Sequence, residues 1–362
     1  MSALSPAPHP QLLCLGLNCR TSPVAVRERL SYTKGRVAAV VKELRALPAV
    51  EDCVLLCTCN RTEVYFWSTE PQTAEQGMMA HFLGSAPDAD TLLACFYRHR
   101  GAAALEHLAR VAAGLDSMVV GETEIFGQLK EAYRIALEAG TTSALSNRCF
   151  QHIFTIGKKV RSSSQITSGP TSVGAVAVQM AQEILGGLEG RNVLIVGAGE
   201  IARSTAKSLR SRGAENLFVA NRSYDRAVAL AEQVGGRVIR FTEWVPYLEN
   251  IDIVIVSTAS PVYVVSPPLL QRVQESRRRP LFLIALSVPR TVDPACAQVP
   301  QVSVYDMDAM QARTEATAAL RHAEIDACGR MIAEWVAEEG AELLQPRRIP
   351  QPSAGREETV SV

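Results

Sequence analysis

The sequence has no net charge, because 37 lysine and arginine residues balance 37 aspartate and glutamate residues. Nothing global therefore attracts the protein to nucleic acid or to a membrane surface, and any contact with RNA has to be local or based on shape. The sequence also lacks an apolar run that approaches the roughly 20 residues needed to span a bilayer. We therefore expect a soluble protein that does not insert into a membrane.

Regular cysteine spacing is also missing. The nine cysteines are odd in number and scattered, which argues against a disulfide framework. Cys57 and Cys59 lack a second cysteine or histidine pair, so a zinc site is not favoured and no metal site is predicted. Residues 1–10 lack the charged and apolar regions of a signal peptide. These features predict a protein of the reducing cytoplasm.

A chain of 362 residues is too long for one ordinary core, so two or three domains are expected. The first domain is predicted over residues 1–161. Its pattern consists of strand-like runs at 12–17, 53–57 and 63–67, a helical segment at 37–47 and helical spacing from 92 to about 160. This pattern predicts an α+β domain with a helical second half.

A second domain is predicted over residues 162–304, where strand and helix patterns alternate. The helices are expected at 173–185, 201–210 and 226–233, and the strands at 193–196, 217–220, 251–257 and 281–286. Such alternation is typical of a Rossmann-like doubly wound parallel sheet, so the chain as a whole is a multidomain α/β protein. The Ser- and Thr-rich segment 162–172 is the predicted joint between the two domains.

The C-terminal part reads as one long helix. Residues 307–344 contain no proline, and their apolar residues recur at roughly helical intervals. A single helix of this length would extend about 55 Å. No compact domain needs so long a helix, so we expect it to run between domains. Residues 346–362 are rich in proline, serine and charge and are predicted to be disordered.

The apolar run 193–196 leads into a glycine turn, as in many dinucleotide-binding units. Two glycines of the fingerprint are present, and an alanine takes the third place. The candidate cofactor-binding residues of this turn are Gly197, Ala198, Gly199, Glu200, Ile201 and Ala202. A close-packed turn without a ligand is the alternative.

The end of the next predicted strand indicates which dinucleotide binds. Enzymes that use NAD place an acidic residue there for the ribose hydroxyls, whereas this chain has Asn221, Arg222 and Ser223. An arginine and a hydroxyl group suit a 2′-phosphate, so NADPH is favoured over NADH. Arg222 is alternatively a solvated surface arginine.

A candidate thiol site lies where the run 53–57 ends. Cys59 stands two residues before Arg61, and residues two apart in an extended segment point to the same side. Both side chains could therefore face one pocket. A thiol reacts as the thiolate, which a nearby cation favours. Cys59 is alternatively a buried and inert thiol.

A predicted helix end lies beyond His107. Taken by itself, His107 is interpreted as a structural histidine, since it lies off the apolar stripe of its helix. Asp116, Ser117 and Glu122 follow at the helix end, where side chains and free backbone groups can meet a ligand.

Taken together, these segments resemble the glutamyl-tRNA reductase family. The resemblance extends in order over roughly 300 residues, and it covers Gly16–Val24 with Arg27 and Glu28, Thr58–Glu63, Gly114–Glu122, Gly127–Lys130, Lys158–Arg161, Ser172–Gly174, Gly197–Glu200, Asn221–Arg222 and Ser287–Arg290. It implies that the protein reduces glutamyl-tRNA to glutamate 1-semialdehyde with NADPH, the first committed step of the five-carbon route to tetrapyrroles. The implied partners are charged tRNA(Glu) and an aminomutase.

The resemblance also implies roles for individual residues. Cys59 is the nucleophile that forms a thioester, and Arg61 holds the side-chain carboxylate of the glutamate. His107 joins Cys59 as a catalytic residue. The other substrate-binding residues are Thr58, Asn60, Ser117, Glu122, Glu124 and Gln128.

The chain departs from the family pattern at several positions. Cys19 replaces a histidine, Thr123 and Glu124 replace Pro-Gln, and Ala285 replaces an acidic residue. Family members usually have further dimerising helices after the long helix, so we expect a shortened dimerisation region and leave a homodimer open.

Two other hypotheses remain. One is a divergent paralogue that reduces another aminoacyl or acyl carrier in a specialised pathway. The other is a non-catalytic homologue that only binds a nucleotide. Retention of Cys59, Arg61 and the glycine turn favours the reductase.

Overall fold

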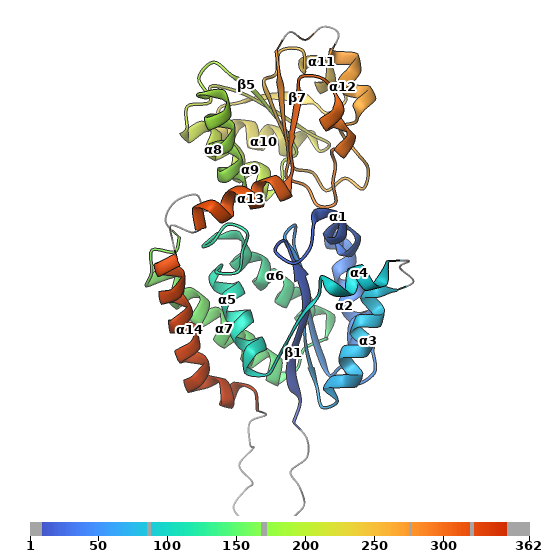
Figure 1. Cartoon of the computed structure of the whole chain (residues 1–362), viewed down its shortest axis with the longest axis vertical. Coiled ribbons are helices and arrows are strands. Elements are labelled where there is room, and N and C mark those ends of the chain that lie inside the picture. The colour runs from blue at the N-terminus through green and yellow to red at the C-terminus, as the bar shows by residue number, and fades with distance from the viewer. Residues whose placement is uncertain are drawn as a thin grey trace, which may run out of the picture.

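The computed structural model describes residues 9–84, 88–167, 172–274, 277, 279–318 and 322–345. Two domains are stacked along the longest axis of the molecule (Figure 1). The lower domain contains a four-stranded antiparallel sheet, and the upper one a six-stranded parallel sheet. We refer to them as the catalytic and the nucleotide-binding domain.

The sheet of the catalytic domain has the order β2-β3-β1-β4. Its strands are β1 (Gln11–Asn18), β2 (Asp52–Cys57), β3 (Arg61–Ser68) and β4 (Tyr97–Arg100). The helices are α1 (Val24–Arg27), the 3-10 turn η1 (Glu28–Leu30), α2 (Lys34–Arg45), α3 (Pro71–Leu83), α4 (Ala89–Ala94), α5 (Ala102–Ala113), α6 (Glu124–Ala139) and α7 (Ala144–Ser162).

Helices cover both faces of this sheet, with α2 and α3 on one side and α5 and α7 on the other (Figure 1). Side chains on both faces of β1 and β3 are therefore buried, which explains why β1 has a nearly continuous apolar run rather than an alternating pattern. The edge strand β4 lies inside the stretch predicted to be helical. The helical prediction was wrong for residues 97–100. A strand of four residues, of which Arg98 and Arg100 are exposed, gives too short an alternation of buried and exposed positions to be recognised.

The sheet of the nucleotide-binding domain has the order β10-β9-β8-β5-β6-β7. Its strands are β5 (Asn192–Val196), β6 (Asn216–Asn221), β7 (Arg237–Arg240), β8 (Ile253–Val256), β9 (Leu281–Ala285) and β10 (Val302–Tyr305). The helices are α8 (Val173–Leu185), α9 (Glu200–Ser211), α10 (Tyr224–Val234), α11 (Trp244–Tyr247), α12 (Pro267–Gln274) and the 3-10 turn η2 (Pro294–Gln298).

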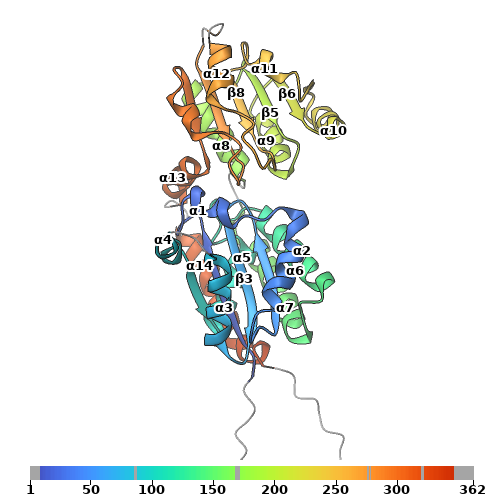
Figure 2. The same cartoon turned by 90° about the vertical axis from the view of Figure 1, so that its right-hand side faces the viewer.

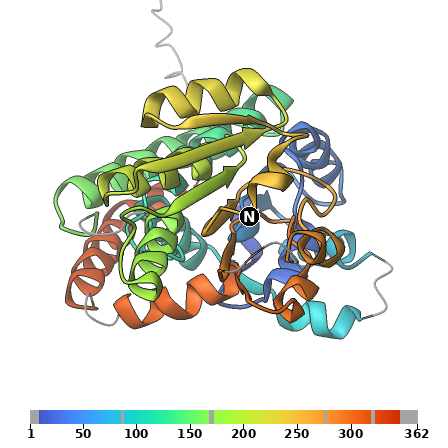
Figure 3. The same ribbon diagram turned by 90° about the horizontal axis from the view of Figure 1, so that it is seen from above.

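Neighbouring residues of the central strand β5 belong to different cores. Val193 and Ile195 pack with α8, α9 and α10, whereas Leu194 and Val196 pack with α11 and α12. Helices therefore lie on both faces of the parallel sheet, as the view from above shows (Figure 3). The predicted doubly wound α/β architecture is confirmed.

The single long helix predicted over residues 307–344 was wrong. The structure has two helices there, α13 (Met307–Ala318) and α14 (His322–Leu343), which run in different directions (Figures 1 and 2). Met307 and Met310 of α13 are buried in the nucleotide-binding domain, whereas Cys328 and Ile332 of α14 pack into the catalytic domain. Helical periodicity shows that residues are buried, but it does not show in which core.

The predicted joint at 162–172 is described only in part, and the predicted disordered tail lies outside the described residues. None of the helices in the described part of the chain is long and apolar enough to cross a bilayer.

Candidate active site

Cys59 lies in the tight turn that joins β2 to β3. The turn is closed by a hydrogen bond from Thr58 N to Arg61 O of 2.8 Å, and the Thr58 hydroxyl accepts bonds from the backbone N–H groups of Asn60 and Arg61. The Cys59 side chain is half-buried and packs against a hydrophobic cluster that joins Cys19, Met118 and Val119 of the catalytic domain to the core of the nucleotide-binding domain. The candidate nucleophile thus lies where the two domains meet.

Arg61 begins β3 and points into the catalytic domain. Its Nη1 donates to Glu63 Oε1 at 2.7 Å and its Nη2 donates to the carbonyl of Asp116 at 2.5 Å. Only 2% of the residue is exposed. The prediction that Cys59 and Arg61 share an extended segment was wrong, because Cys59 is in the turn and only Arg61 is in the strand.

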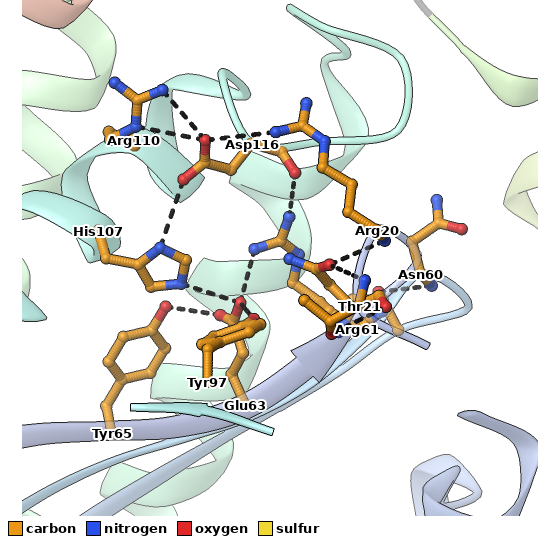
Figure 4. Close-up of polar contacts among 12 residues, drawn as sticks. Arg20, Thr21, Asn60, Arg61, Glu63, Tyr65, Tyr97, His107, Arg110 and Asp116 are labelled. Atoms are coloured by element: carbon orange, nitrogen blue, oxygen red, sulfur yellow. Dashed lines mark hydrogen bonds and ion pairs between the residues drawn. The ribbon is translucent and has the colours of Figure 1, made fainter. Parts of the chain in front are cut away.

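Glu63, His107 and Asp116 form a buried charged chain beside Arg61 (Figure 4). The Nε2 atom of His107 is 3.1 Å from Glu63 Oε1, and its Nδ1 atom is 3.3 Å from Asp116 Oδ2. Burial alone would lower the pKa of His107, but the Glu63 carboxylate and the hydrogen bond to Asp116 raise it well above its usual value. A carboxylate at each ring nitrogen thus favours the imidazolium form of His107.

The cations beside Glu63 and Asp116 favour the ionised form of both carboxyl groups. Burial would raise the pKa of Glu63, but the charges of Arg61 and His107 lower it far below its usual value. Asp116 behaves likewise, chiefly through its hydrogen bond to His107. Arg110 Nη2 adds an ion pair to Asp116 at 3.2 Å. Positive and negative charges alternate, so each buried charge has a partner.

A cavity of about 410 Å³ opens on this charged chain. Its lining includes Asn18, Arg20, Thr21, Tyr97, His99, Ala103, Glu106, His107, Arg110 and Asp116. The cations Arg20 and Arg110 face it together with Asp116. A small polar ligand with a carboxylate suits a cavity of this size and charge.

The carboxyl groups of Glu122 and Glu124 affect the pKa of the Cys59 thiol. Burial, followed by the charges of Glu122 and Glu124, raises the pKa of Cys59 to about 12, and Arg27 opposes this rise. Burial together with Glu122 and Glu200 raises the pKa of Glu124 itself to about 7. Burial and acidic neighbours thus outweigh the cation that opposes them, which is Arg27 and not the predicted Arg61.

The remaining predicted substrate residues lie around these groups. Ser117 is buried. Its hydroxyl group lowers the pKa of Glu122, but the burial of Glu122 raises that pKa by more. Asn60 is also buried, and its Oδ1 atom has no hydrogen-bond partner among the described residues. Gln128 lies on α6 one turn after Glu124, and it lines neither the charged cavity nor the pocket of the nucleotide-binding domain. The structure therefore brings most, but not all, of the predicted set together.

The candidate cofactor pocket lies at the carboxyl ends of the parallel strands. It has a volume of about 320 Å³, and its lining includes Ala198, Gly199, Asn221, Arg222, Ser223, Arg226, Phe241, Thr258 and Val264. Dinucleotides bind at this edge in doubly wound folds. Of the other predicted residues, Gly197 precedes the pocket, Glu200 and Ile201 begin α9, and Ala202 is buried inside α9.

The two glycines are required for different reasons. Gly197 has a φ of +124°, and a Cβ atom there would lie 1.9 Å from the carbonyl oxygen of Ser257. A Cβ on Gly199 would meet nothing within 4 Å, and Gly199 caps α9 without a side-chain hydrogen bond. The open space at the free helix N-terminus fits a pyrophosphate group. The residues of this turn thus suit a dinucleotide.

Sequence reasoning missed several residues that the structure places in the two sites. Arg226 joins Arg222 at the nucleotide pocket, and its place in the first turn of the helix that follows β6 could have revealed it. Thr258 also lines this pocket, and its buried Oγ1 atom has no partner among the described residues. It follows β8, so strand order could have pointed to it. Glu63 and Arg20 were noticed only as parts of family motifs.

Comparisons with known proteins agree with this division of the chain. Residues 15–164 match the model of the glutamyl-tRNA(Glu) reductase N-terminal domain, and residues 179–313 match that of shikimate / quinate 5-dehydrogenase. The second match and the glycine turn together indicate a nicotinamide cofactor.

Similar whole proteins are also found. The chain is 47% identical to the glutamyl-tRNA reductase of Akkermansia muciniphila over 90% of its own length and 96% of that protein. It is 42% identical to that of Desulforudis audaxviator, again over 90% of this chain but over 73% of the relative. The solved glutamyl-tRNA reductase of Methanopyrus kandleri is 32% identical over 92% of this chain and 80% of that one, with a TM-score of 0.49. By its sequence relatives, the chain belongs to the glutamyl-tRNA reductase family.

Proposed function

We propose that this chain is an NADPH-dependent oxidoreductase that converts glutamyl-tRNA to glutamate 1-semialdehyde through a thioester on Cys59. Family membership supports the reaction. The observation on which the proposal rests most is that Cys59 packs against the cluster of apolar residues in which the two domains meet. An acyl group on this sulfur would therefore lie between the two domains.

The first step of the proposed reaction is acyl transfer. The Cys59 sulfur attacks the ester carbonyl of glutamyl-tRNA, the carbon–oxygen bond to the ribose breaks, and the thiol proton ends on the released ribose hydroxyl. The ester oxygen donates electrons into the carbonyl, whereas sulfur does so weakly. The thioester is therefore the better acceptor for the next step.

The second step is reduction. When bound, the reduced nicotinamide supplies a hydride, which brings two electrons to the thioester carbon. The carbon–sulfur bond then breaks, the aldehyde leaves, and Cys59 departs as a thiolate that takes up one proton from solvent. Because the pKa of the Cys59 thiol is about 12, this thiolate is readily protonated.

The cavity lined by Arg20, His107 and Arg110 is the proposed site for the glutamyl group. Its cations would attract the side-chain carboxylate. Arg61 lies behind it, already paired with Glu63, and would add positive charge to the inner wall. Thr58 shapes the turn, while Asn60, Ser117, Glu122, Glu124 and Gln128 remain proposed contacts.

The choice of NADPH rests on the basic end of the cofactor pocket. Arg222 and Arg226 both line it, together with the hydroxyl group of Ser223. Two guanidinium groups favour a 2′-phosphate, and the described lining contains no carboxylate that would repel one.

The proposed partners are charged tRNA(Glu) and an aminomutase that removes the unstable aldehyde. A homodimer stays a prediction, which light scattering would test. The apolar side of α14 is already used, because Cys328, Ile332 and Leu343 pack into the catalytic domain of the same chain. The cytoplasmic location stays a prediction.

The test is to incubate the protein with glutamyl-tRNA and NADPH, follow semialdehyde formation and repeat with Cys59→Ser. We expect activity in the wild type, an acylated Cys59 by mass spectrometry when NADPH is left out, and neither in the variant. Aldehyde formation without any acylated sulfur would contradict the thioester route. Activity only with another acyl donor would favour the paralogue.

A further inference from the structure

Arg27, the last residue of α1, is a buried cation with no part in the chemistry described above. Only 2% of it is exposed. Its Nε atom donates to the carbonyl of Ser22 at 3.2 Å, and its Nη1 atom donates to the carbonyl of Cys59 at 2.8 Å. Its Nη2 atom donates to Asp308 Oδ1, also at 2.8 Å. One guanidinium group therefore holds three partners at once.

Asp308 belongs to the other domain. It lies in the first turn of α13, between Met307 and Met310, whose side chains are buried in the core of the nucleotide-binding domain. The Asp308 carboxylate also accepts bonds of 3.1 and 3.2 Å from the backbone N–H of Val24, where α1 begins. Arg27 is thus a direct link between the backbone of the nucleophile turn and the nucleotide-binding domain.

A second ion pair joins the same two domains without touching the Cys59 turn. Arg290 donates to Glu28 through Nε at 2.9 Å and through Nη2 at 2.5 Å, and its backbone N–H adds a bond of 3.1 Å. This pair offers an internal comparison, because its loss weakens domain contact but leaves the hydrogen bond to Cys59 in place.

The geometry needs an arginine at position 27. A guanidinium group is a rigid planar fork that can donate in three fixed directions, whereas a lysine ammonium is a point charge on a flexible chain. If the domains separate, Arg27 also loses its anion, which is unfavourable for a cation whose other partners are two backbone carbonyl groups. Contact between the domains and the placement of the Cys59 turn therefore depend on each other.

We infer that Arg27 is a positioning residue that couples docking of the nucleotide-binding domain to the placement of Cys59. When Asp308 is in place, Arg27 fixes the turn so that the acylated sulfur is held toward the nucleotide-binding domain. The inference rests on the proposed function, because it assigns the acyl group to Cys59.

The experiment compares four variants with the wild type: Arg27→Lys, Asp308→Asn, Glu28→Gln and Arg29→Lys. The last is the matched control, since Arg29 lies in the same segment and pairs with Asp88 at 2.7 Å on the surface of the catalytic domain. Two rates are measured for each. One is acylation of Cys59 by glutamyl-tRNA without NADPH, followed by rapid quench and mass spectrometry, and the other is single-turnover aldehyde formation with NADPH.

We expect Arg27→Lys to slow both steps, with aldehyde formation falling by up to about 100-fold, as a displacement near 1 Å of reacting groups can do. Asp308→Asn keeps an acceptor oxygen but removes the charge, so it slows aldehyde formation more than acylation. Glu28→Gln slows aldehyde formation alone. Arg29→Lys changes neither rate. NADPH affinity and the melting temperature, measured on every variant, show that each one is folded and binds cofactor.

Wild-type rates in both Arg27→Lys and Asp308→Asn would overturn the inference. So would identical profiles for Arg27→Lys and Glu28→Gln, since Arg27 would then serve domain contact alone. If Arg27→Lys does not fold, Asp308→Asn carries the test. A wild-type protein that makes aldehyde but never acylates Cys59 would refute the proposed function instead.

Discussion

Arg61 donates a 2.7 Å hydrogen bond to the carboxylate of Glu63, and both side chains are buried. The residue that the sequence offers as a carboxylate clamp therefore already holds a carboxylate of its own. A substrate carboxylate would add to this charge arrangement rather than meet an unpaired guanidinium. The stability of the protein and its use of glutamyl-tRNA should therefore respond differently to substitution of Arg61 and Glu63.

Arg61→Ala should impair the use of glutamyl-tRNA far more than it lowers NADPH affinity. It should also lower the free energy of unfolding, by at most about 3–5 kcal/mol, because the buried Glu63 carboxylate loses one of its two cationic partners and keeps only His107. The double variant Arg61→Met with Glu63→Leu should regain most of this stability but not the substrate use. Urea unfolding and steady-state kinetics measure the two effects. Recovery of both in the double variant would make Arg61 purely structural.

His107 should contribute stability that fades as the pH rises. Its folded pKa lies well above the unfolded value of about 6.5, so its contribution is complete below that value and is lost as the pH passes through the raised pKa. His107→Gln should therefore cost more stability at pH 6 than at high pH. His99→Gln is the control of opposite sign, because burial lowers the pKa of His99. Equal costs of His107→Gln at both pH values would contradict the imidazolium.

Glu124→Gln should lower the pKa of the Cys59 thiol, because the Glu124 charge contributes to its rise to about 12. The pH dependence of alkylation by iodoacetamide measures this shift. Glu124 itself has a folded pKa raised to about 7, so its ionisation opposes folding above the unfolded pKa. The variant should be more stable than the wild type at pH 8, by about 1 kcal/mol after allowance for solvent screening, and no more stable at pH 4.

The two glycines of the nucleotide turn should respond differently to a methyl group. Gly199→Ala should leave the melting temperature unchanged but weaken cofactor binding, because its Cβ meets only the open space proposed for the pyrophosphate. Gly197→Ala should lower the melting temperature, because its Cβ would clash with the Ser257 carbonyl oxygen. Calorimetry and fluorescence titration with NADPH measure both effects. Unchanged NADPH affinity in Gly199→Ala would contradict the proposed cradle.

Arg222→Ala and Arg226→Ala should each weaken NADPH binding by roughly tenfold to 100-fold, the size of one lost hydrogen bond to a charged group. NADH binding should change little, since it lacks the 2′-phosphate. Titration of each variant with NADPH and with NADH gives the loss of affinity for each nucleotide. Equal losses for the two nucleotides would place the arginines elsewhere on the cofactor.

The sequence predicts the parts of the fold that have a clear period. Four of the six strands of the parallel sheet (β5, β6, β8 and β9) and the helices α8, α9 and α10 are found where apolar runs and helical spacing place them, and Gly197 needs its glycine for the expected reason. The outer strands β7 and β10 and the short helices α11 and α12 were not predicted. The direction of the Arg61 side chain could not be predicted, because it depends on Glu63 and on the Asp116 carbonyl, 55 residues away. The pKa of Cys59 was missed for a similar reason, since its neighbours Glu122 and Glu124 come from a distant segment.

Because α14 returns to pack on α5 and α7, the chain passes from one domain to the other twice, between α7 and α8 and again between α13 and α14. Two domains that the chain connects at two separate points can rotate about the line that joins the connections, whereas rotation about other axes is restricted. The two crossings of the chain therefore restrict how the nucleotide-binding domain can turn relative to the catalytic domain.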